Sequence, residues 1–300
     1  MDEKQQDRPQ AALTQAYGYC ETLLREHDKD RFLADLFLPA KVRPHAQALH
    51  AFSYEIARVR DVVSEPMPGE IRHQWWRDAL ANPARDDIIA NPVAAALTHT
   101  LTHCGLPSAP LLALIEARGS DLYDDPMPDM ATLEAYCRDT SSVLFRLVAA
   151  TLASANLAEG QPARDLDDDR DFAEQAATHG GIAYAFTGLI RAFALHAAQG
   201  RVYAPLDLLQ RHGSSHEEAL GGRATPQLRA AIGDWRKAAR RHLAAAKAAI
   251  RDLPRELGPA FLPLALCEPY LHLTEATAYD PFRTPIELPQ WRRQWILWWG

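Results

Sequence analysis

The chain has 300 residues, of which 47% are hydrophobic and 24% charged. This composition is typical of a folded globular protein and excludes disorder as the main state. A formal net charge of −7 argues against a nucleic-acid-binding protein, because phosphate backbones require a basic face. The four cysteines lie far apart without a C-x-x-C pair, which excludes a disulfide scaffold or zinc ribbon and favours a reducing compartment.

The N-terminus, MDEKQQDRPQ, is polar, so it lacks the apolar core of a secretory signal. We expect residues 1–8 to be flexible. The longest apolar stretches are interrupted by Arg146 and Arg191, and spanning a bilayer takes about 18 uncharged apolar residues. The sequence therefore predicts a cytoplasmic protein without a membrane span, with peripheral attachment to the inner membrane as the open alternative.

Helical periodicity runs along nearly the whole chain. Leu49, Phe52, Ile56, Val59 and Val63 recur at steps of three and four, which predicts one long helix over 41–65. Similar patterns predict helices at 10–27, 69–81, 91–103, 108–118, 130–156, 170–198, 226–252 and 285–299. Only short breaks separate them, so we predict a single all-α domain over 1–300, a bundle of about ten helices that ends in a tryptophan-rich helix at 285–300.

Three segments carry a family resemblance. The first is LPAKVRPHAQALHAFSYEIARVRDVVSEP, the second LEAYCRDTSSVLFRL and the third GIAYAFTGLIRAFALHAAQGRVYAPLDLLQRHG. They resemble, in the same order, the first active-site segment, the middle helix and the second active-site segment of the squalene/phytoene synthase family. The resemblance implies the all-α isoprenoid synthase fold, with a central cavity for prenyl diphosphates.

In that family, carboxylates spaced i and i+4 on facing helices hold the Mg²⁺ ions that chelate the diphosphate. The resemblance places these positions and their polar neighbours on residues that carry no carboxylate: Arg60 and Ser64 in the first segment, and Ala185, Gly188, Ala192 and His196 in the second. We therefore predict no metal site and no cofactor.

A carboxylate pair, Asp61 and Glu65, survives one residue later in the first segment. One residue is a rotation of about 100° on a helix, which turns the pair away from the apolar seam of Val59 and Val63. We interpret the pair as solvated and bridged to Arg58. The alternative, a rebuilt Mg²⁺ site, would require a local change of register.

Five further residues are weaker candidates. Asp121 and Asp125 lie at the end of a predicted helix, where residues 119–122 resemble a family helix near the cavity mouth. With Asp61 and Glu65 they complete the set of catalytic candidates. Arg191 lies in a nearly all-apolar helix, where a guanidinium needs an internal ion pair or an anionic ligand. Arg201 and Tyr203 match the family's G-R-x-Y and share both interpretations, so the three form our predicted ligand-binding set.

His99 and His103 have the i, i+4 spacing of a helical metal pair. No carboxylate lies close to them in the sequence, so we interpret them as ordinary surface or core histidines.

Four of the seven tryptophans lie near the C-terminus. Trp291, Trp295 and Trp298 fall on one helical face, beside Arg292 and Arg293. Two interpretations are open. The helix docks into the core through its tryptophans, or it lies at a membrane interface with tryptophan at headgroup depth and arginine facing anionic lipid.

EIARVRDVVSEP followed by GEIRHQWWRDAL is similar to a branch of the family that acts in assembly of respiratory complex I. We therefore predict a non-catalytic family member whose partners are respiratory assembly intermediates, an isoprenoid or lipid ligand and a membrane surface, with no nucleic acid. One alternative is an active head-to-head prenyl transferase that uses Mg²⁺ and prenyl diphosphates. Another is a non-enzymatic binder of isoprenoid lipid.

Overall fold

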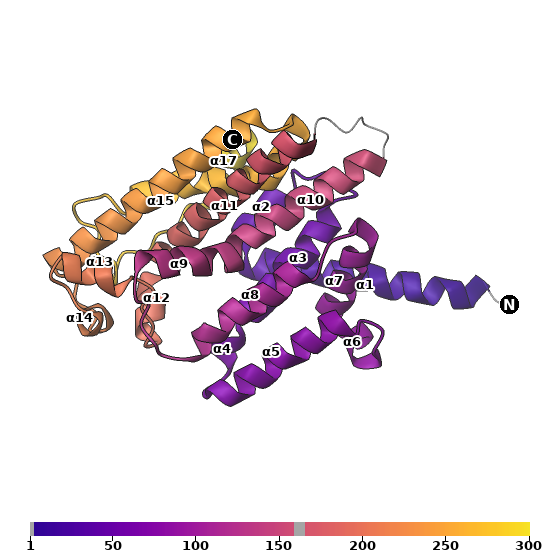
Figure 1. The fold of residues 1–300 in the computed structure, drawn as a ribbon, viewed down its shortest axis with the longest axis horizontal. Helices are drawn as coiled ribbons and strands as arrows, with labels where there is room; N and C mark the ends of the chain where they lie inside the picture. Colours follow the sequence, from indigo (N-terminus) through magenta and orange to yellow (C-terminus); the bar gives the residue numbers. More distant parts are fainter. Residues whose placement is uncertain (1–2, 159–165) are drawn as a thin grey trace. The chain divides into compact units, whose positions relative to one another are not determined.

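The computed structural model describes residues 3–158 and 166–300, in which α-helices dominate and no β-strand occurs (Figure 1). The predicted all-α class is confirmed. The chain falls into two compact units. The first unit comprises Met1–Tyr123, Arg146–Leu166 and Pro254–Ala260, and the second comprises Asp124–Phe145, Asp167–Leu253 and Phe261–Gly300. That they form one domain stays a prediction, as does the flexibility of residues 1–8, of which 1 and 2 lie outside the described residues.

The first unit is organised around α3, which buries every residue from His45 to Ser53. Burial on all sides marks a central helix, and α1 and α7 pack against α3 and against each other. The elements are α1 (Glu3–His27), α2 (Lys29–Asp35), α3 (Arg43–Ala57), α4 (Val59–Val62), α5 (Pro66–Ala81), α6 (Asp86–Ala90), α7 (Pro92–Cys104), α8 (Ala109–Gly119) and the 3-10 helix η1 (Ser120–Leu122).

The second unit has a core between α11 and α15, where the fully buried rings of Phe186 and Trp235 meet edge to face at 5.9 Å. Its elements are α9 (Met130–Cys137), the π-helix η2 (Arg138–Ser142), α11 (Leu166–Arg191), α12 (Phe193–Ala198), α13 (Leu206–Arg211), α14 (His216–Leu220), α15 (Pro226–Asp252), α16 (Cys267–Leu273) and α17 (Gln290–Trp299). Two elements, α10 (Val143–Ala158) and η3 (Arg255–Leu266), cross from one unit to the other along the chain.

The continuous helix predicted over 41–65 is wrong, because the structure divides this stretch. α3 ends at Ala57, α4 ends at Val62, and Val63 is extended (φ −121°, ψ 144°). Pro66 explains the end, since a proline disfavours helical backbone in the residue before it. Pro66 then opens α5 at its first turn, where its missing N–H costs nothing.

Two other predicted helices also differ from the structure. The 170–198 stretch breaks at Ala192 (φ −89°, ψ 9°), which separates α11 from α12. The last helix begins only at Gln290, because Pro289 caps it in extended backbone (φ −56°, ψ 148°). The structure has more and shorter helices than the periodicity predicts, partly because of these breaks and partly because α2, α6, α13, α14 and α16 lie outside the predicted ranges.

Candidate functional site

Asp61 and Glu65 do not share a helix. Asp61 lies in α4, whereas Glu65 precedes α5 in extended backbone (φ −129°, ψ 151°), and both side chains are exposed. An i, i+4 pair projects side by side only from one continuous helix. Arg58, the expected bridging partner of this pair, places its Nη1 atom 3.3 Å from Oε1 of Glu55 instead. The helix break therefore removes the geometry that a rebuilt metal pair would need.

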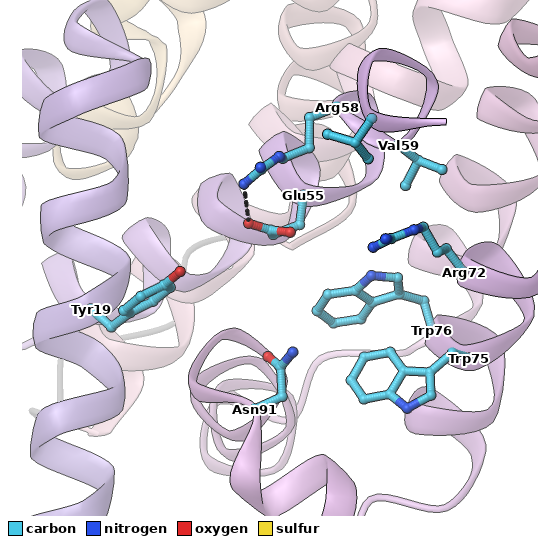
Figure 2. A pocket seen from close by; sticks show the side chains of 9 residues that line it. Tyr19, Glu55, Arg58, Val59, Arg72, Trp75, Trp76 and Asn91 are labelled. Carbon is cyan, nitrogen blue, oxygen red and sulfur yellow. Dashed lines mark hydrogen bonds and ion pairs between the residues drawn. The ribbon is translucent and has the colours of Figure 1, made fainter. Parts of the chain in front are cut away.

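The first unit contains a cavity of about 470 Å³ on this same stretch of chain (Figure 2). Its apolar wall consists of Tyr19 from α1, Val59 and Val62 from α4, and Trp75 and Trp76 from α5. The two indole rings are fixed at right angles to each other, with centroids 5.0 Å apart. Packing of large aromatic side chains in this way gives a rigid surface at low entropic cost.

Buried and polar contacts behind the cavity hold both indoles. Trp76 is 5% exposed and meets the ring of Phe52 edge to face at 5.2 Å. Trp75 donates from Nε1 to Asp87 Oδ2 at 2.9 Å. Phe52 and Asp87 thus hold the two indoles, and both rings line the cavity.

The polar part of the cavity is cationic. Its lining side chains include the guanidinium groups of Arg58 and Arg72, the carboxylate of Glu55 and the amide of Asn91. Figure 2 shows the Arg58–Glu55 ion pair on one side of the opening and Arg72 reaching towards Trp76 on the other. Asn91 accepts the N–H of Ala94 at 3.0 Å through Oδ1, which leaves its amide hydrogens for another acceptor.

Asp121 and Asp125 fall in different units. Asp121 is 7% exposed and forms an ion pair with Arg118, with 3.0 Å between Oδ2 and Nη1. His73 is buried nearby, and burial lowers its pKa. Asp125 lies exposed at the start of the second unit. The ion pair gives Asp121 a structural part in the first unit, and its catalytic role stays a prediction.

Residues of the predicted ligand-binding set lie around aromatic rings in the second unit. The guanidinium carbon of Arg191 is 3.6 Å from the ring centroid of Tyr270, a cation–π contact. Tyr203 lies between two rings, with centroid distances of 4.9 Å to His196 and 5.8 Å to Tyr136. Arg201 donates a hydrogen bond to Gln199. The aromatic partner of Arg191 was missed because Tyr270 is distant in sequence.

The sequence matches the model of the squalene/phytoene synthase family over residues 24–299. The chain belongs to this family. It is 30% identical over 269 residues to "NADH dehydrogenase (ubiquinone) complex I, assembly factor 6" of Mus musculus, which covers 90% of this chain and 77% of that protein. It is 25% identical over 297 residues to the 15-cis-phytoene synthase of Synechococcus elongatus, covering 95% and 92%.

Among solved structures, squalene synthase HpnC from Alicyclobacillus acidocaldarius superposes with a TM-score of 0.73. The identity is 22%, and the match covers 90% of this chain and 97% of that one. The all-α isoprenoid synthase fold predicted from the resemblance is therefore confirmed.

The assignment of Arg60, Ser64, Ala192 and His196 to the family's metal positions stays a prediction. Arg60 lies in α4 and Ser64 follows it, Ala192 separates α11 from α12, and His196 lies in α12 against Tyr203. Mg²⁺ prefers oxygen ligands, above all carboxylates, and these side chains offer a cation, a hydroxyl, a methyl and an imidazole. In the described part of the chain, no three His, Cys, Asp or Glu residues group so as to hold a metal ion.

The C-terminal tryptophans do not dock into the core. Trp291, Trp295 and Trp298 are 68%, 63% and 73% exposed, and Trp299, which the helical pattern did not include, is 71% exposed. The helix is anchored by Leu297, which is 2% exposed. The core-docking interpretation is therefore wrong for these side chains, since they lie on the solvent side of α17. None of the described helices is long and apolar enough to cross a bilayer.

A histidine cluster in the first unit adds Tyr17 and His45, which sequence analysis missed, to His99 and His103. The hydroxyl of Tyr17 lies 3.0 Å from His45 Nδ1 and 2.9 Å from His99 Nδ1, and the ring of His103 stacks on that of His45 at 5.0 Å. Burial, together with His103 and His99, lowers the pKa of His45 to about 4. The helices α1, α3 and α7 bring these residues together, so the spacing of His99 and His103 was the one sign of the cluster in the sequence.

Proposed function

We propose that this chain acts in assembly of respiratory complex I and does not catalyse prenyl transfer. The proposal rests on the resemblance, which places Arg60, Ser64, Ala192 and His196, none of them a carboxylate, at the family's metal positions. Similarity to the mouse protein named as a complex I assembly factor supports the same conclusion. A diphosphate leaving group needs its developing charge neutralised, and a bound metal supplies several kcal/mol of that stabilisation.

The break between α4 and α5 adds a second argument. Of the carboxylates nearest to the lost pair, Asp61 lies in α4, whereas Glu65 lies in the extended segment before α5. Two charges brought near one Mg²⁺ need a fixed backbone frame, and extended backbone at Val63 does not provide it. A prenyl transferase built on this pair would therefore require α4 to continue through Pro66.

Two assays test the proposal. Farnesyl diphosphate and Mg²⁺ should give no pyrophosphate with this chain, while the Synechococcus elongatus phytoene synthase serves as the family control with its own substrate. Cells that lack this chain should contain less assembled complex I, and the double variant Asp61→Asn, Glu65→Gln should restore it as well as the wild type. Robust Mg²⁺-dependent pyrophosphate release would favour the alternative prenyl transferase, which the 25% identity to that synthase supports.

We further propose that the protein works at the surface of an anionic membrane through α17. Four exposed tryptophans on a ten-residue helix, with Arg292 exposed beside them, have the composition of an interfacial helix. Indole rings partition to headgroup depth, and arginine is attracted to anionic lipid. An isoprenoid lipid as ligand belongs to the same proposal and would reach the protein from that surface.

A further inference from the structure

We propose that the first unit binds a small organic anion, a carboxylate or monophosphate with a flat apolar body, in the cavity lined by Arg72, Trp75 and Trp76. This site is separate from complex I assembly and from prenyl transfer. The volume of about 470 Å³ falls within the range of roughly 300–1,000 Å³ that holds small ligands. Its walls come from helices that pack in a single unit, so the shape is preformed.

The charge of the side chains that line the cavity favours an anionic ligand. Two guanidinium groups and one carboxylate line the cavity, so these side chains carry a net charge of +1. Glu55 is engaged by Arg58 at 3.3 Å, whereas Arg72 makes no ion pair or hydrogen bond within the described part of the chain. The protein as a whole carries a net charge of −7. The positive charge of this cavity is therefore opposite in sign to that of the chain, and it favours an anionic ligand. Arg72 can form the paired, charge-assisted hydrogen bonds that a guanidinium makes with carboxylate or phosphate.

The aromatic wall selects a flat apolar body. Trp75 and Trp76 come from neighbouring positions of α5, one turn after Arg72, so the cation and both rings face one space (Figure 2). The contacts to Asp87 and Phe52 hold these rings in place. A planar apolar group stacks on such surfaces, and a rigid wall loses little entropy when it does. The amide hydrogens of Asn91 add a donor for a second oxygen of the ligand.

The cavity lies on a different helix face from the family's metal positions. Within α4, Val59 and Val62 line the cavity. Arg60 lies roughly 130° around the helix axis from the point midway between them. A ligand in this cavity therefore does not occupy the prenyl diphosphate position that the resemblance implies, and the two proposals succeed or fail independently.

The probe for this site is 2-naphthoate, with neutral 2-naphthamide as its matched analogue, titrated calorimetrically into the full chain. We expect saturable binding at one site, and naphthamide about tenfold weaker because it lacks the charge. Arg72→Gln should weaken naphthoate by about tenfold and Arg72→Lys by less, since lysine keeps the charge without the fork. Arg77→Gln, on the same helix but paired with Glu116, is the control and should bind like the wild type.

Three results would overturn the proposal. They are no saturable binding at millimolar naphthoate, an unchanged affinity in Arg72→Gln, and equal binding of naphthamide. Inorganic phosphate alone should bind much more weakly than naphthoate; an equal affinity would show that the aromatic wall has no part. Because Arg72 is exposed, its variants should fold normally, and a circular dichroism melt of each confirms that a loss of binding is not a loss of structure.

Discussion

The α3–α5 region of the first unit and the α11–α12 region of the second carry the two segments that define the family, yet their polar residues differ. The first region keeps charged side chains, with Asp61 in α4, Glu65 in the extended segment before α5, and Arg58 and Arg72 around a cavity. In the second region, the positions that the resemblance implies to be polar hold small residues and His196.

The two regions also differ in how they are packed. α11 approaches the backbone of η2 closely at Gly181, where a side chain has no room. A Cβ atom at Gly181 would lie 2.2 Å from Cα of Ser142. Most residues from 60 to 65 are exposed, and substitution of exposed charged groups usually changes stability little. One region is therefore constrained by backbone contact, and the other is free to change its chemistry.

The largest expected effect tests that constraint. Gly181→Ala should lower the free energy of unfolding by about 3 kcal/mol, because the added methyl group meets backbone that cannot rotate away. The matched control is Gly188→Ala on the same helix, where a Cβ meets nothing within 4 Å. It should raise stability by about 0.5–1 kcal/mol through helix propensity. Urea denaturation of both variants measures the contrast, and equal stabilities would remove the packing argument.

The next effect contrasts the histidine clusters of the two units. His45 has a pKa of about 4 in the folded chain, against about 6.5 when unfolded. Between these values the unfolded chain binds more protons, so stability is full above pH 6.5 and is lost as the pH falls towards 4. The loss should be on the order of 2 kcal/mol. Urea unfolding at pH 7 and pH 4.5 measures it, and His45→Gln should reduce the difference.

The matched variant in the second unit is His242→Gln. Burial also lowers the pKa of His242, but Glu134, 3.3 Å away, acts in the opposite direction. Its removal should change the acid sensitivity less than removal of His45. A larger change would mean that the carboxylate does not compensate for burial as proposed.

Much of the fold could be predicted from the sequence. The apolar seams predicted helices because helical periodicity is a local pattern, and the motifs of the family resemblance predicted the fold because they too are read from local spacing. Pro66 could have signalled the break after Val62, since the residue before a proline avoids helical backbone. The cavity could not be foreseen, because Tyr19, Arg72 and Asn91 come from separate segments. The C-terminal tryptophans were ambiguous because a stripe of aromatic residues has the same spacing whether it is buried or exposed.

A smaller effect on stability should distinguish Arg191, which stacks on an aromatic ring, from Arg72, which has no such contact among the described residues. Arg191→Leu should cost about 1 kcal/mol of stability, since the side chain stacks on Tyr270 at 3.6 Å and loses that cation–π contact. Arg72→Leu should change stability by less than about 0.5 kcal/mol, as expected for an exposed side chain. Thermal unfolding of the two variants makes the comparison, and a costly Arg72 change would assign it a structural part instead of a ligand.

The smallest effect on stability is expected at α17, where the effect on membrane binding should be large. The double change Trp295→Ala, Trp298→Ala removes two side chains that are 63% and 73% exposed, so the free energy of unfolding should fall by no more than about 0.5 kcal/mol. Binding to phosphatidylglycerol vesicles should weaken strongly, because burial of indole in the interface drives attachment. Neutral phosphatidylcholine vesicles should bind less of the wild-type protein, since Arg292 then has no anionic lipid to meet.

Sedimentation with vesicles and urea denaturation on the same variant separate membrane binding from folding. A wild-type protein that never sediments with anionic vesicles would contradict attachment through α17. Leu297→Ala supplies the opposite case, because Leu297 is 2% exposed and its truncation should cost about 2–3 kcal/mol. If the double tryptophan variant behaved like Leu297→Ala, those rings would be packing groups, and the exposed face of α17 would lose its assigned membrane role.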